Sequence, residues 1–320
     1  MMKVLFVSSG NSVKGISPIV SRQGESLKNR SVEIHFFTII GKGFKGYLAN
    51  LKKLKAIIKE FNPDIIHAHY SMSAYLATLA YAKPLVVSLM GSDVKSSVFS
   101  KFLIKLFNRL FWAHLIVKSE DMRQHLDISG VSVIPNGVDT NVFYSMDKAS
   151  CQEQLKWDLG AIHILFAAKP TRPVKNVALA QQAYKLLNNK NATLHVLNDV
   201  SPELIPIWMN AADIVMLTSL WEGSPNVIKE AMACNRPIVA TNVGDIKWLF
   251  GNEPGHFLAD FESKDVAEKL KLAIEYRENN GATKGRERII ELGLDSETIA
   301  QKIIEVYNSV LQKKINENIF

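Results

Sequence analysis

The sequence predicts an α/β protein with two Rossmann-like, doubly wound domains, and three observations lead to this prediction. Short apolar runs rich in Val, Ile and Phe alternate with longer segments of helical periodicity, which is typical of parallel strands joined by crossover helices. The alternation occurs twice, on either side of a polar stretch at residues 139–159. The 320 residues also exceed what one hydrophobic core usually supports, about 250–300 residues. We therefore expect domains at residues 1–145 and 146–295, and a helix at 296–320 that returns to the N-terminal domain.

The individual elements follow from the same alternation. In the first domain we expect strands at residues 4–9, 32–39, 64–69, 84–89, 114–119 and 131–137, and helices at 17–30, 47–61 and 98–112. In the second domain we expect strands at 163–168, 192–197, 213–219, 237–241 and 255–259, and helices at 177–188, 204–211 and 226–234, followed by the last helix at 296–314. Ligands of open parallel sheets bind at the carboxyl ends of the strands, so the loops that follow the strands are the candidate sites.

Composition narrows the class of protein. Lys and Arg exceed Asp and Glu by 38 − 31 = 7, which suits an anionic partner without naming one. The cysteines, Cys151 and Cys234, form no disulfide framework and no metal-ligand spacing, and they suit a reducing compartment, so we expect a cytoplasmic protein. No apolar stretch reaches the roughly 18 residues of a membrane span, and no basic-aromatic motif indicates nucleic acid, so we expect neither a membrane span nor a nucleic-acid partner.

The segment SLWEGSPNVIKEAMACN has the clearest helix signals. We expect Ser224 to be the N-cap, Pro225 to occupy the first helical position, and Asn235 to end the helix in the left-handed conformation. The buried stripe is expected to consist of Val227, Ile228, Ala231 and Met232.

Polar groups gather at the start of this helix. Glu222 precedes the helix, and Asn226 and Glu230 share its polar flank, four residues apart. The backbone N–H groups of Gly223, Ser224 and Asn226 are available to bind oxygen atoms of a ligand. Glu222 by itself can simply stabilise the helix N-terminus by its charge. Because that interpretation leaves Glu230 and the glycine unexplained, the group predicts a polyol-binding site.

A basic loop, AAKPTRPVKN, follows the strand expected at 163–168. Lys169, Arg172 and Lys175 stand ahead of the next helix, where the helix dipole is already positive. Three cations at this end favour an anion such as a diphosphate. The alternative is an ordinary solvated basic loop.

Two further loops carry candidate residues. The strand expected at 64–69 contains His67 and ends in His69, and a histidine at a strand end can equally be part of the packing or of a turn. The loop SSGNSVKGIS contains Gly15 but lacks the G-x-G-x-x-G spacing, so a dinucleotide-binding dehydrogenase is poorly supported.

The segment EGSPNVIKEAMACNRPIVAT closely resembles the Glu-x7-Glu signature of retaining family-four glycosyltransferases, which have the GT-B fold with two domains that face a central cleft. In that family the first glutamate, here Glu222, contacts the hydroxyls of the donor sugar, and the second, here Glu230, contacts the nucleotide ribose. The intervening amides, here those of Gly223, Ser224 and Asn226, hold sugar and phosphate. The sequence EGSPNVIKEAMACN most resembles the corresponding segment of bacterial enzymes of surface-polysaccharide or teichuronic-acid assembly.

The resemblance extends to the other loops. It implies that Lys175 neutralises the leaving diphosphate together with a second cation, which is either Lys169 or Arg172. It places a histidine against the donor sugar, and we choose His69 before His67. It also implies that Gly15 lies close to the donor phosphates and the acceptor.

Two segments resemble family regions on the acceptor side. In SLMGSDV, Asp93 either contacts the acceptor or supports its own loop, and His67 is the second acceptor-side candidate. In VIPNGVDTNVF, Asn136 and Gly137 read as an ordinary turn.

We therefore expect a retaining hexosyltransferase that uses a UDP- or GDP-linked sugar and a glycan or lipid-linked acceptor in cell-surface polysaccharide synthesis. No D-x-D sequence occurs and cations already face the phosphates, so we expect no metal and no cofactor. The resemblance supplies no carboxylate nucleophile, which favours front-face attack within an oxocarbenium-like ion pair. A non-catalytic nucleotide-sugar-binding scaffold and a sugar-nucleotide epimerase of the same fold are the alternatives.

The segment SVFSKFLIKLFNRLFW, residues 97–112, suggests one more partner. Lys101, Lys105 and Arg109 recur four residues apart on one face, with Phe and Leu elsewhere. Such a helix can dock on an anionic membrane, or it can be an ordinary domain helix with a basic solvent face.

Overall fold

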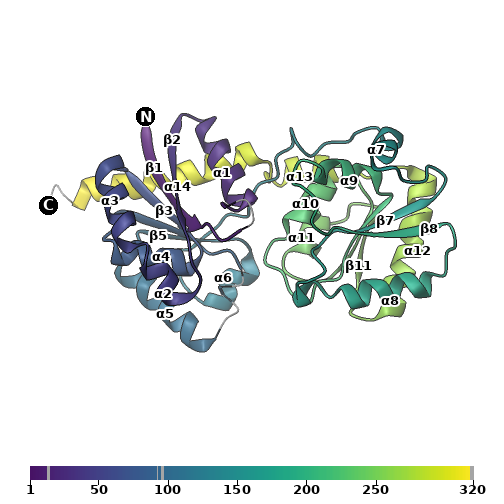
Figure 1. Ribbon diagram of the computed structural model, residues 1–320, viewed down its shortest axis with the longest axis horizontal. Coiled ribbons are helices and arrows are strands. Elements are labelled where there is room, and N and C mark those ends of the chain that lie inside the picture. The colour runs from purple at the N-terminus through teal and green to yellow at the C-terminus, as the bar shows by residue number, and fades with distance from the viewer. Residues whose placement is uncertain (13–14, 92, 95–96, 318–320) are drawn as a thin grey trace. The chain divides into compact units, whose positions relative to one another are not determined.

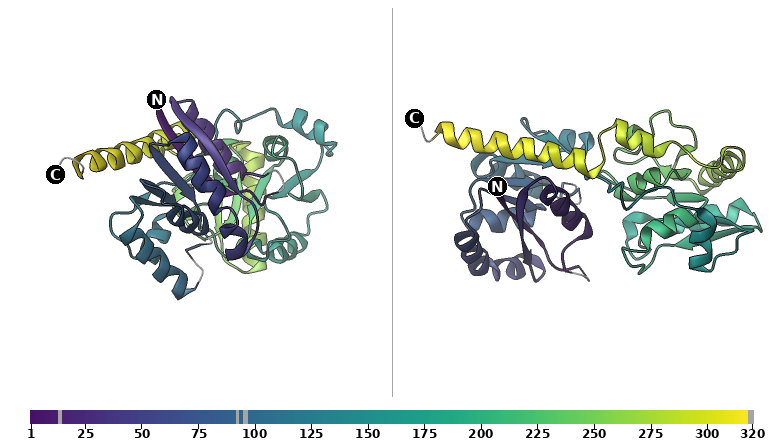
Figure 2. Two further views of the ribbon diagram at one scale, coloured as in Figure 1. Left: turned by 60° about the vertical axis from the view of Figure 1, so that its left-hand side comes forward. Right: turned by 90° about the horizontal axis from the view of Figure 1, so that it is seen from above.

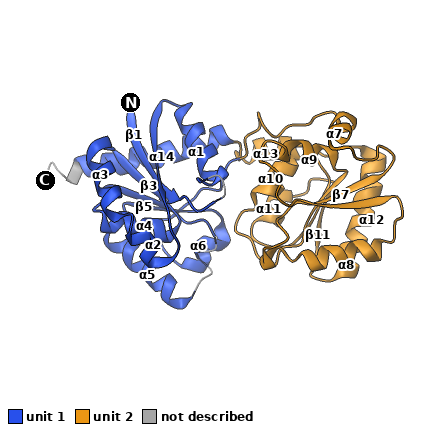
Figure 3. Ribbon diagram, viewed as in Figure 1, with its two compact units in different colours: residues 1–137, 296–320 blue, residues 138–295 orange. Residues whose placement is uncertain are grey.

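The chain forms two compact units in the computed structural model, Met1–Gly137 with Ser296–Phe320 (unit 1) and Val138–Asp295 (unit 2) (Figure 3). The structure describes residues 1–12, 15–91, 93–94 and 97–317. Both units are α/β, with a twisted parallel sheet between helices (Figure 1).

Unit 1 is built on a parallel sheet with the strand order β2-β1-β3-β4-β5-β6. Its strands are β1 (Met2–Ser9), β2 (Val32–Ile39), β3 (Ile65–His69), β4 (Leu85–Ser88), β5 (His114–Val117) and β6 (Ser132–Val133). Strand β1 is central and its residues from Val4 to Val7 are fully buried, so the sheet has helices on both faces.

The helices of unit 1 divide between these two faces. The core cluster on one face joins Leu5 and Val7 to side chains of α3 (Leu51–Phe61), α4 (Ser71–Leu79), α5 (Val98–Leu110) and α6 (Glu120–Leu126). Helix α1 (Pro18–Lys28) packs against α14 (Ser296–Glu317), and Tyr307 of α14 contacts His67 of β3. Figure 2 shows α14, in yellow, along unit 1. The C-terminal helix is therefore part of the core of unit 1.

Unit 2 repeats the architecture with the strand order β11-β10-β9-β7-β8, again parallel. Its strands are β7 (Ile162–Phe166), β8 (Ala192–Val196), β9 (Ile214–Leu217), β10 (Ile238–Thr241) and β11 (His256–Ala259). The helical segments are α7 (Lys148–Leu155), the 3₁₀ turn η1 (Pro173–Lys175), α8 (Val177–Leu187), α9 (Ile205–Ala211), α10 (Asn226–Ala233), α11 (Ile246–Phe250), α12 (Ser263–Asn280) and α13 (Gly285–Glu291).

The predicted fold class is confirmed, and the expected strands all occur. The expected helix at 47–61 is wrong in one respect, because α2 (Gly43–Leu48) ends before α3 begins. Asn50 lies between the two helices, and its buried carboxamide donates hydrogen bonds to the carbonyls of Ile40 (2.9 Å) and Gly46 (2.7 Å). These side-chain bonds compete with a continuous helix. Helix α7 lies in the stretch expected to be a polar connection, and α6, α11, α12 and α13 were not expected.

Candidate functional site

Three loops of unit 2 follow neighbouring strands and therefore lie at the same edge of the sheet. They are residues 167–176 after β7, 218–225 after β9 and 242–245 after β10. Strands β7, β9 and β10 are adjacent in the sheet, so these loops lie side by side.

Glu222 is fixed by residues of two of these loops. Its carboxylate forms an ion pair with Lys175 and accepts a 2.6 Å hydrogen bond from the Ser219 hydroxyl on the same oxygen, Oε1. The side chains of Lys175 and Glu222 are only 12% and 14% exposed. The sequence-predicted cation and the first glutamate are thus in direct contact.

The backbone of the two loops is also joined. The hydroxyl of Thr218 donates to the carbonyl of Asn176 (2.9 Å), and the N–H of Leu220 donates to the carbonyl of Val174 (2.8 Å). These bonds hold the turn that carries Lys175 against the loop that carries Glu222. The ion pair therefore rests on a rigid frame rather than on two free loops.

Gly244 brings the third loop against the same segment. It has φ +59°, and a Cβ built at this position would lie 2.5 Å from the carbonyl oxygen of Gly223 and 2.8 Å from that of Glu222. The N–H of Asp245 donates to the carbonyl of Gly223 (3.2 Å). Only glycine allows this approach, so Gly244 packs directly against the backbone of the Glu222 loop.

Helix α10 begins at Asn226, with Pro225 as its N-cap. The expected Ser224 cap is wrong, because its hydroxyl instead accepts a 3.1 Å bond from the buried Lys229 ammonium. The left-handed ending is confirmed, since Asn235 has φ +55°. Ile228, Ala231 and Met232 are fully buried as expected, while Val227 is half-buried.

The start of α10 offers several groups to a ligand. The N–H groups of Gly223, Ser224 and Asn226 donate to no other residue within the described part of the chain. The side-chain oxygen of Asn226 is buried and has no hydrogen-bond partner among the described residues. Glu230 lies half-buried one turn further along. These donors and acceptors match oxygens of a sugar, a ribose or a phosphate in kind.

A buried lysine, Lys229, and the carboxyl of Asp245 carry opposite charges behind this helix start. Lys229 is fully buried, and burial lowers the pKa of its ammonium to about 8, against the attraction of Asp245 and Glu230. Burial raises the pKa of the Asp245 carboxyl to about 6, and the ammonium of Lys229 opposes this rise. The two opposite charges attract each other, and the ammonium of Lys229 also donates to the Ser224 hydroxyl beside the site.

The two candidate second cations differ from Lys175 in their surroundings. Lys169 is exposed and pairs with Asp199 at 2.9 Å, an ion pair whose side chains are 49% and 72% exposed. Arg172 is also exposed, and it precedes the 3₁₀ turn that carries Lys175. Both belong to the loop after β7, and either can swing toward an anion because an exposed ion pair is worth little.

In unit 1, His67 and His69 stack on each other with ring centroids 4.3 Å apart. The ring nitrogens of His67 are both engaged, with the hydroxyls of Tyr307 (2.6 Å) and Ser88 (2.8 Å). Both ring nitrogens of His69 are buried without a partner among the described residues. Burial, followed by the charge of Lys118, lowers the pKa of His69 to about 3, so its ring is neutral. Of the two, His69 has hydrogen-bonding capacity left.

Asp93 supports its own loop, one of the two roles expected for it. Its buried carboxylate accepts hydrogen bonds from the N–H groups of Ser71 (3.1 Å), Met90 (3.1 Å) and Gly91 (2.9 Å). Burial raises the pKa of Asp93, and these backbone bonds oppose the rise. An additional contact with an acceptor stays a prediction.

Gly15 has φ +80° and exchanges backbone hydrogen bonds with Ser12 (2.9 and 3.3 Å). A Cβ built on Gly15 meets no atom within 4 Å. The expected closeness of this residue to donor and acceptor stays a prediction, and the intervening residues 13 and 14 lie outside the described residues.

Sequence reasoning missed four residues that shape the site in unit 2: Ser219, Lys229, Gly244 and Asp245. Lys229 carried a signal, because a lysine in the middle of an apolar stripe is either exposed or paired. The sequence signal for Gly244 and Asp245 was weaker. They only follow an expected strand, and loops after strands are candidate sites. Ser219 could be assigned only once its distance to Glu222 was known.

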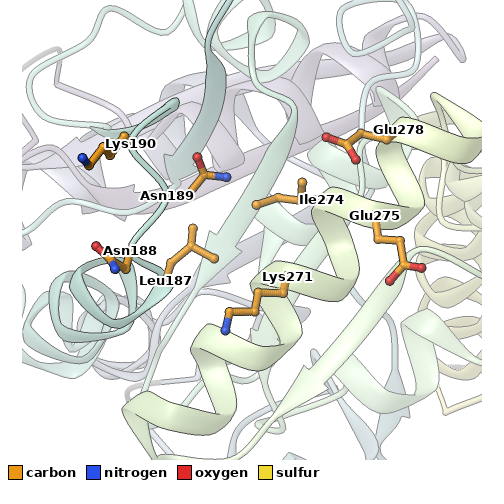
Figure 4. A pocket seen from close by; sticks show the side chains of 8 residues that line it. All are labelled: Leu187, Asn188, Asn189, Lys190, Lys271, Ile274, Glu275 and Glu278. Atoms are coloured by element: carbon orange, nitrogen blue, oxygen red, sulfur yellow. The ribbon is translucent and has the colours of Figure 1, made fainter.

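A groove elsewhere on unit 2 is separate from these loops. Its volume is about 460 Å³, and it is lined by Leu187, Asn188, Asn189, Lys190, Lys271, Ile274, Glu275 and Glu278 (Figure 4). Residues 188–190 directly precede β8, so the groove lies at the amino edge of the sheet, opposite the carboxyl ends of the strands.

The described residues contain neither a metal-ligand cluster nor a membrane-spanning helix. No group of three or more His, Cys, Asp or Glu side chains is arranged to hold a metal ion in this part of the chain. Over the same residues, we find no helix with the length and apolar character needed to cross a bilayer.

Comparisons with known proteins agree with this architecture. The family model "Glycosyltransferase Family 4" matches residues 7–142, and "Glycosyl transferases group 1" matches residues 153–275. The teichuronic acid biosynthesis glycosyltransferase TuaC of Bacillus subtilis is 25% identical over 249 residues, 69% of this chain and 64% of TuaC. The UDP-Gal:alpha-D-GlcNAc-diphosphoundecaprenol alpha-1,3-galactosyltransferase of Escherichia coli is 24% identical over 262 residues, 68% of each chain.

Solved structures show the same fold over nearly the whole chain. Sucrose-phosphate synthase from Thermosynechococcus elongatus superposes with a TM-score of 0.81 at 14% identity, covering 98% of this chain and 100% of the other. Anabaena HepE in complex with UDP and glucose gives a TM-score of 0.77 at 20% identity, covering 97% and 100%. With its Glu-x7-Glu segment, its two matched halves and this fold, the chain belongs to the GT-B glycosyltransferases that combine a family 4 domain with a group 1 domain.

Proposed function

We propose that the protein is a retaining hexosyltransferase that takes a sugar from a UDP- or GDP-linked donor. The observation that carries the proposal is the held carboxylate of Glu222, which Lys175 and Ser219 fix beside the unpaired N–H groups at the start of α10. A sugar hydroxyl can donate to that carboxylate while diphosphate oxygens accept from the amides and from Lys175. The complex of HepE with UDP and glucose supports a nucleotide-sugar as the ligand class.

The remaining site residues have matching roles in this proposal. Glu230, half-buried on the same helix flank as Asn226, accepts from the hydroxyls of the nucleotide ribose. Lys169 or Arg172 assists Lys175 with the diphosphate. His69 serves the transfer through its free ring nitrogens, which suit sugar hydroxyls because the neutral ring both donates and accepts.

The proposed reaction retains the anomeric configuration without a metal ion. The bond between the anomeric carbon and the diphosphate oxygen breaks, and the acceptor oxygen bonds to the same face of the sugar. The acceptor's hydroxyl proton passes to the leaving phosphate oxygen. Lys175 and its neighbouring cation stabilise the charge that develops on the leaving group, which is the part usually given to a metal ion. The unpaired amides at α10 add to this stabilisation.

We propose a glycan or lipid-linked acceptor in cell-surface polysaccharide synthesis. Support comes from the names of two relatives, a teichuronic acid biosynthesis glycosyltransferase and a galactosyltransferase acting on a diphosphoundecaprenol-linked sugar.

The test is a binding and turnover screen with UDP-, GDP- and ADP-sugars and with each free nucleotide. We expect one donor to stabilise the wild-type protein, by about 2.7 kcal/mol at a ligand concentration 100 times the Kd. Glu230→Ala should weaken binding of both donor and free nucleotide, whereas Glu222→Gln should weaken only the donor. Glu275→Ala, an exposed glutamate of α12 in the groove of Figure 4, is the matched control.

The outcomes separate the alternatives. Nucleotide release on adding an acceptor extract supports the transferase. Conversion of the donor into another sugar-nucleotide shows an epimerase instead, and donor binding without turnover under any acceptor indicates a scaffold. If no nucleotide or donor binds, the site assignment itself is wrong.

A further inference from the structure

Helix α5 presents apolar side chains to solvent rather than to the core. Five residues make up this α5 apolar face, with the exposed fractions Val98 85%, Phe99 67%, Phe102 58%, Leu106 37% and Leu110 58%. At 3.6 residues per turn they fall within an arc of about 120°. Ile104, which is fully buried in the core cluster, projects from the opposite side of the helix. The solvent side of α5 is thus largely apolar, which differs from the basic solvent face that was one of the two alternatives expected from the sequence.

Cations line one edge of the α5 apolar face, and α5 itself contains no acidic residue. Lys105 and Arg109 are exposed, and Lys101 is half-buried along the same edge. Lys105 lies 3.3 Å from Asp127, an ion pair exposed to 44% and 93%, which holds the lysine only weakly. The helix thus combines an exposed apolar stripe with a positive border.

The apolar stripe with its positive border favours an anionic lipid surface over a second copy of the chain. A second copy of the chain that docked through the same face would bring the cations of both copies together, and such like-charge contacts are unfavourable. An anionic lipid surface instead satisfies both halves of the pattern, because acyl chains receive the apolar side chains and headgroup phosphates receive the cations. Lys and Arg stems also reach outward along an apolar surface while their charges stay in water.

We propose that α5 docks unit 1 on an anionic membrane surface. Phe99, Phe102 and Leu106 enter the boundary between headgroups and acyl chains, while Lys105 and Arg109 meet lipid phosphates. The helix lies along the surface and does not cross the bilayer. The proposal uses no residue of the donor site in unit 2, so it stands whether or not the protein transfers a sugar.

The experiment is co-sedimentation of the full chain with vesicles. One set contains equal parts of phosphatidylglycerol and phosphatidylcholine, and the other contains phosphatidylcholine alone. Lys101→Gln/Lys105→Gln/Arg109→Gln should weaken binding to the anionic vesicles roughly 100-fold, from about 1 kcal/mol per cation. Phe99→Ser/Phe102→Ser tests the apolar half and should also release the protein.

Helix α3 provides the matched control. Lys52, Lys53 and Lys59 are exposed there, and the three Lys→Gln substitutions remove the same charge from unit 1 without touching an exposed apolar stripe. We expect this variant to bind anionic vesicles far better than the α5 charge variant. All variants alter exposed or half-buried side chains, and thermal unfolding checks that their folds are intact.

Several outcomes would overturn the proposal. One is equal binding to both kinds of vesicle or to neither. Another is an equal loss in the α3 and α5 charge variants, which would mean that overall charge is responsible. A third is concentration-dependent self-association that Phe99→Ser/Phe102→Ser abolishes without vesicles, which would assign the face to a second copy.

Discussion

The ion pair between Lys175 and Glu222 is the most specific feature of the site. A double-mutant cycle tests whether the two side chains interact. Lys175→Met removes the cation, Glu222→Gln removes the charge but keeps an acceptor for Ser219, and the double variant removes both charges. The two side chains are 12% and 14% exposed, so each single variant leaves its partner's charge largely out of water.

The magnitude follows from this burial. Leaving one member of a buried pair uncompensated costs about 3–5 kcal/mol, and removing both charges costs much less. Allowing for the residual exposure, we expect each single variant to lose about 3 kcal/mol, and the double variant to lose about 1 kcal/mol. For a domain of about 150 residues, a loss of 3 kcal/mol lowers Tm by roughly 6–12 °C.

Urea denaturation of the four proteins, followed by fluorescence and circular dichroism, gives the coupling free energy. The prediction is a double variant more stable than either single variant. Additive losses in the cycle would refute the contact, because two groups that do not interact give no coupling. Repeating the cycle with saturating donor should reduce the coupling, since the ligand then occupies both charged groups.

Three further predictions concern the frame of the site and unit 1. Gly244→Ala should destabilise unit 2 by more than Gly281→Ala in urea denaturation. Both residues have positive φ, costing an alanine about 1–2 kcal/mol, but only Gly244 also meets backbone atoms, so equal losses would contradict the close approach. Lys229→Met should cost about 3–5 kcal/mol at neutral pH and Lys229→Met/Asp245→Asn clearly less, and a double variant as unstable as the single one would argue against the attraction between the two charges. The folded-state pKa of His69, about 3, lies below the unfolded value of 6.5, so its contribution to stability is full above pH 6.5 and is lost as the pH falls. Between about pH 8 and pH 5 this contribution falls by about 2 kcal/mol, and His69→Phe should lose that part of the pH dependence in chemical denaturation, whereas an unchanged slope would contradict a buried neutral ring.

Much of the fold could be predicted because local periodicity and burial agree in a parallel α/β protein. The residues from Val4 to Val7 in β1 and from Ile214 to Leu217 in β9 are apolar at every position, as strands covered on both faces must be. The helix break at Asn50 could not be predicted, because it depends on carbonyls that only the folded backbone brings within reach of the side chain.

The candidate site was predictable in its residue types but not in its contacts. The segment from Glu222 to Glu230 can be recognised from its Glu-x7-Glu pattern. The pairing of Glu222 with Lys175, by contrast, joins residues 47 positions apart. The sequence ranked His69 above His67 only by resemblance, and the structure adds that His67 is occupied by Tyr307, 240 residues away. Such long-range partners are set by strand order and by α14, which local patterns do not encode.

Retention by the proposed transferase can be tested by real-time proton NMR of the slow hydrolysis of the stabilising donor, with water as the acceptor. We expect the wild-type protein to consume an α-linked nucleotide-sugar and the α-anomer of the free sugar to appear first, before mutarotation. Release of the β-anomer first would contradict retention, and no consumption of any binding donor, with or without added acceptors, would contradict the transferase itself.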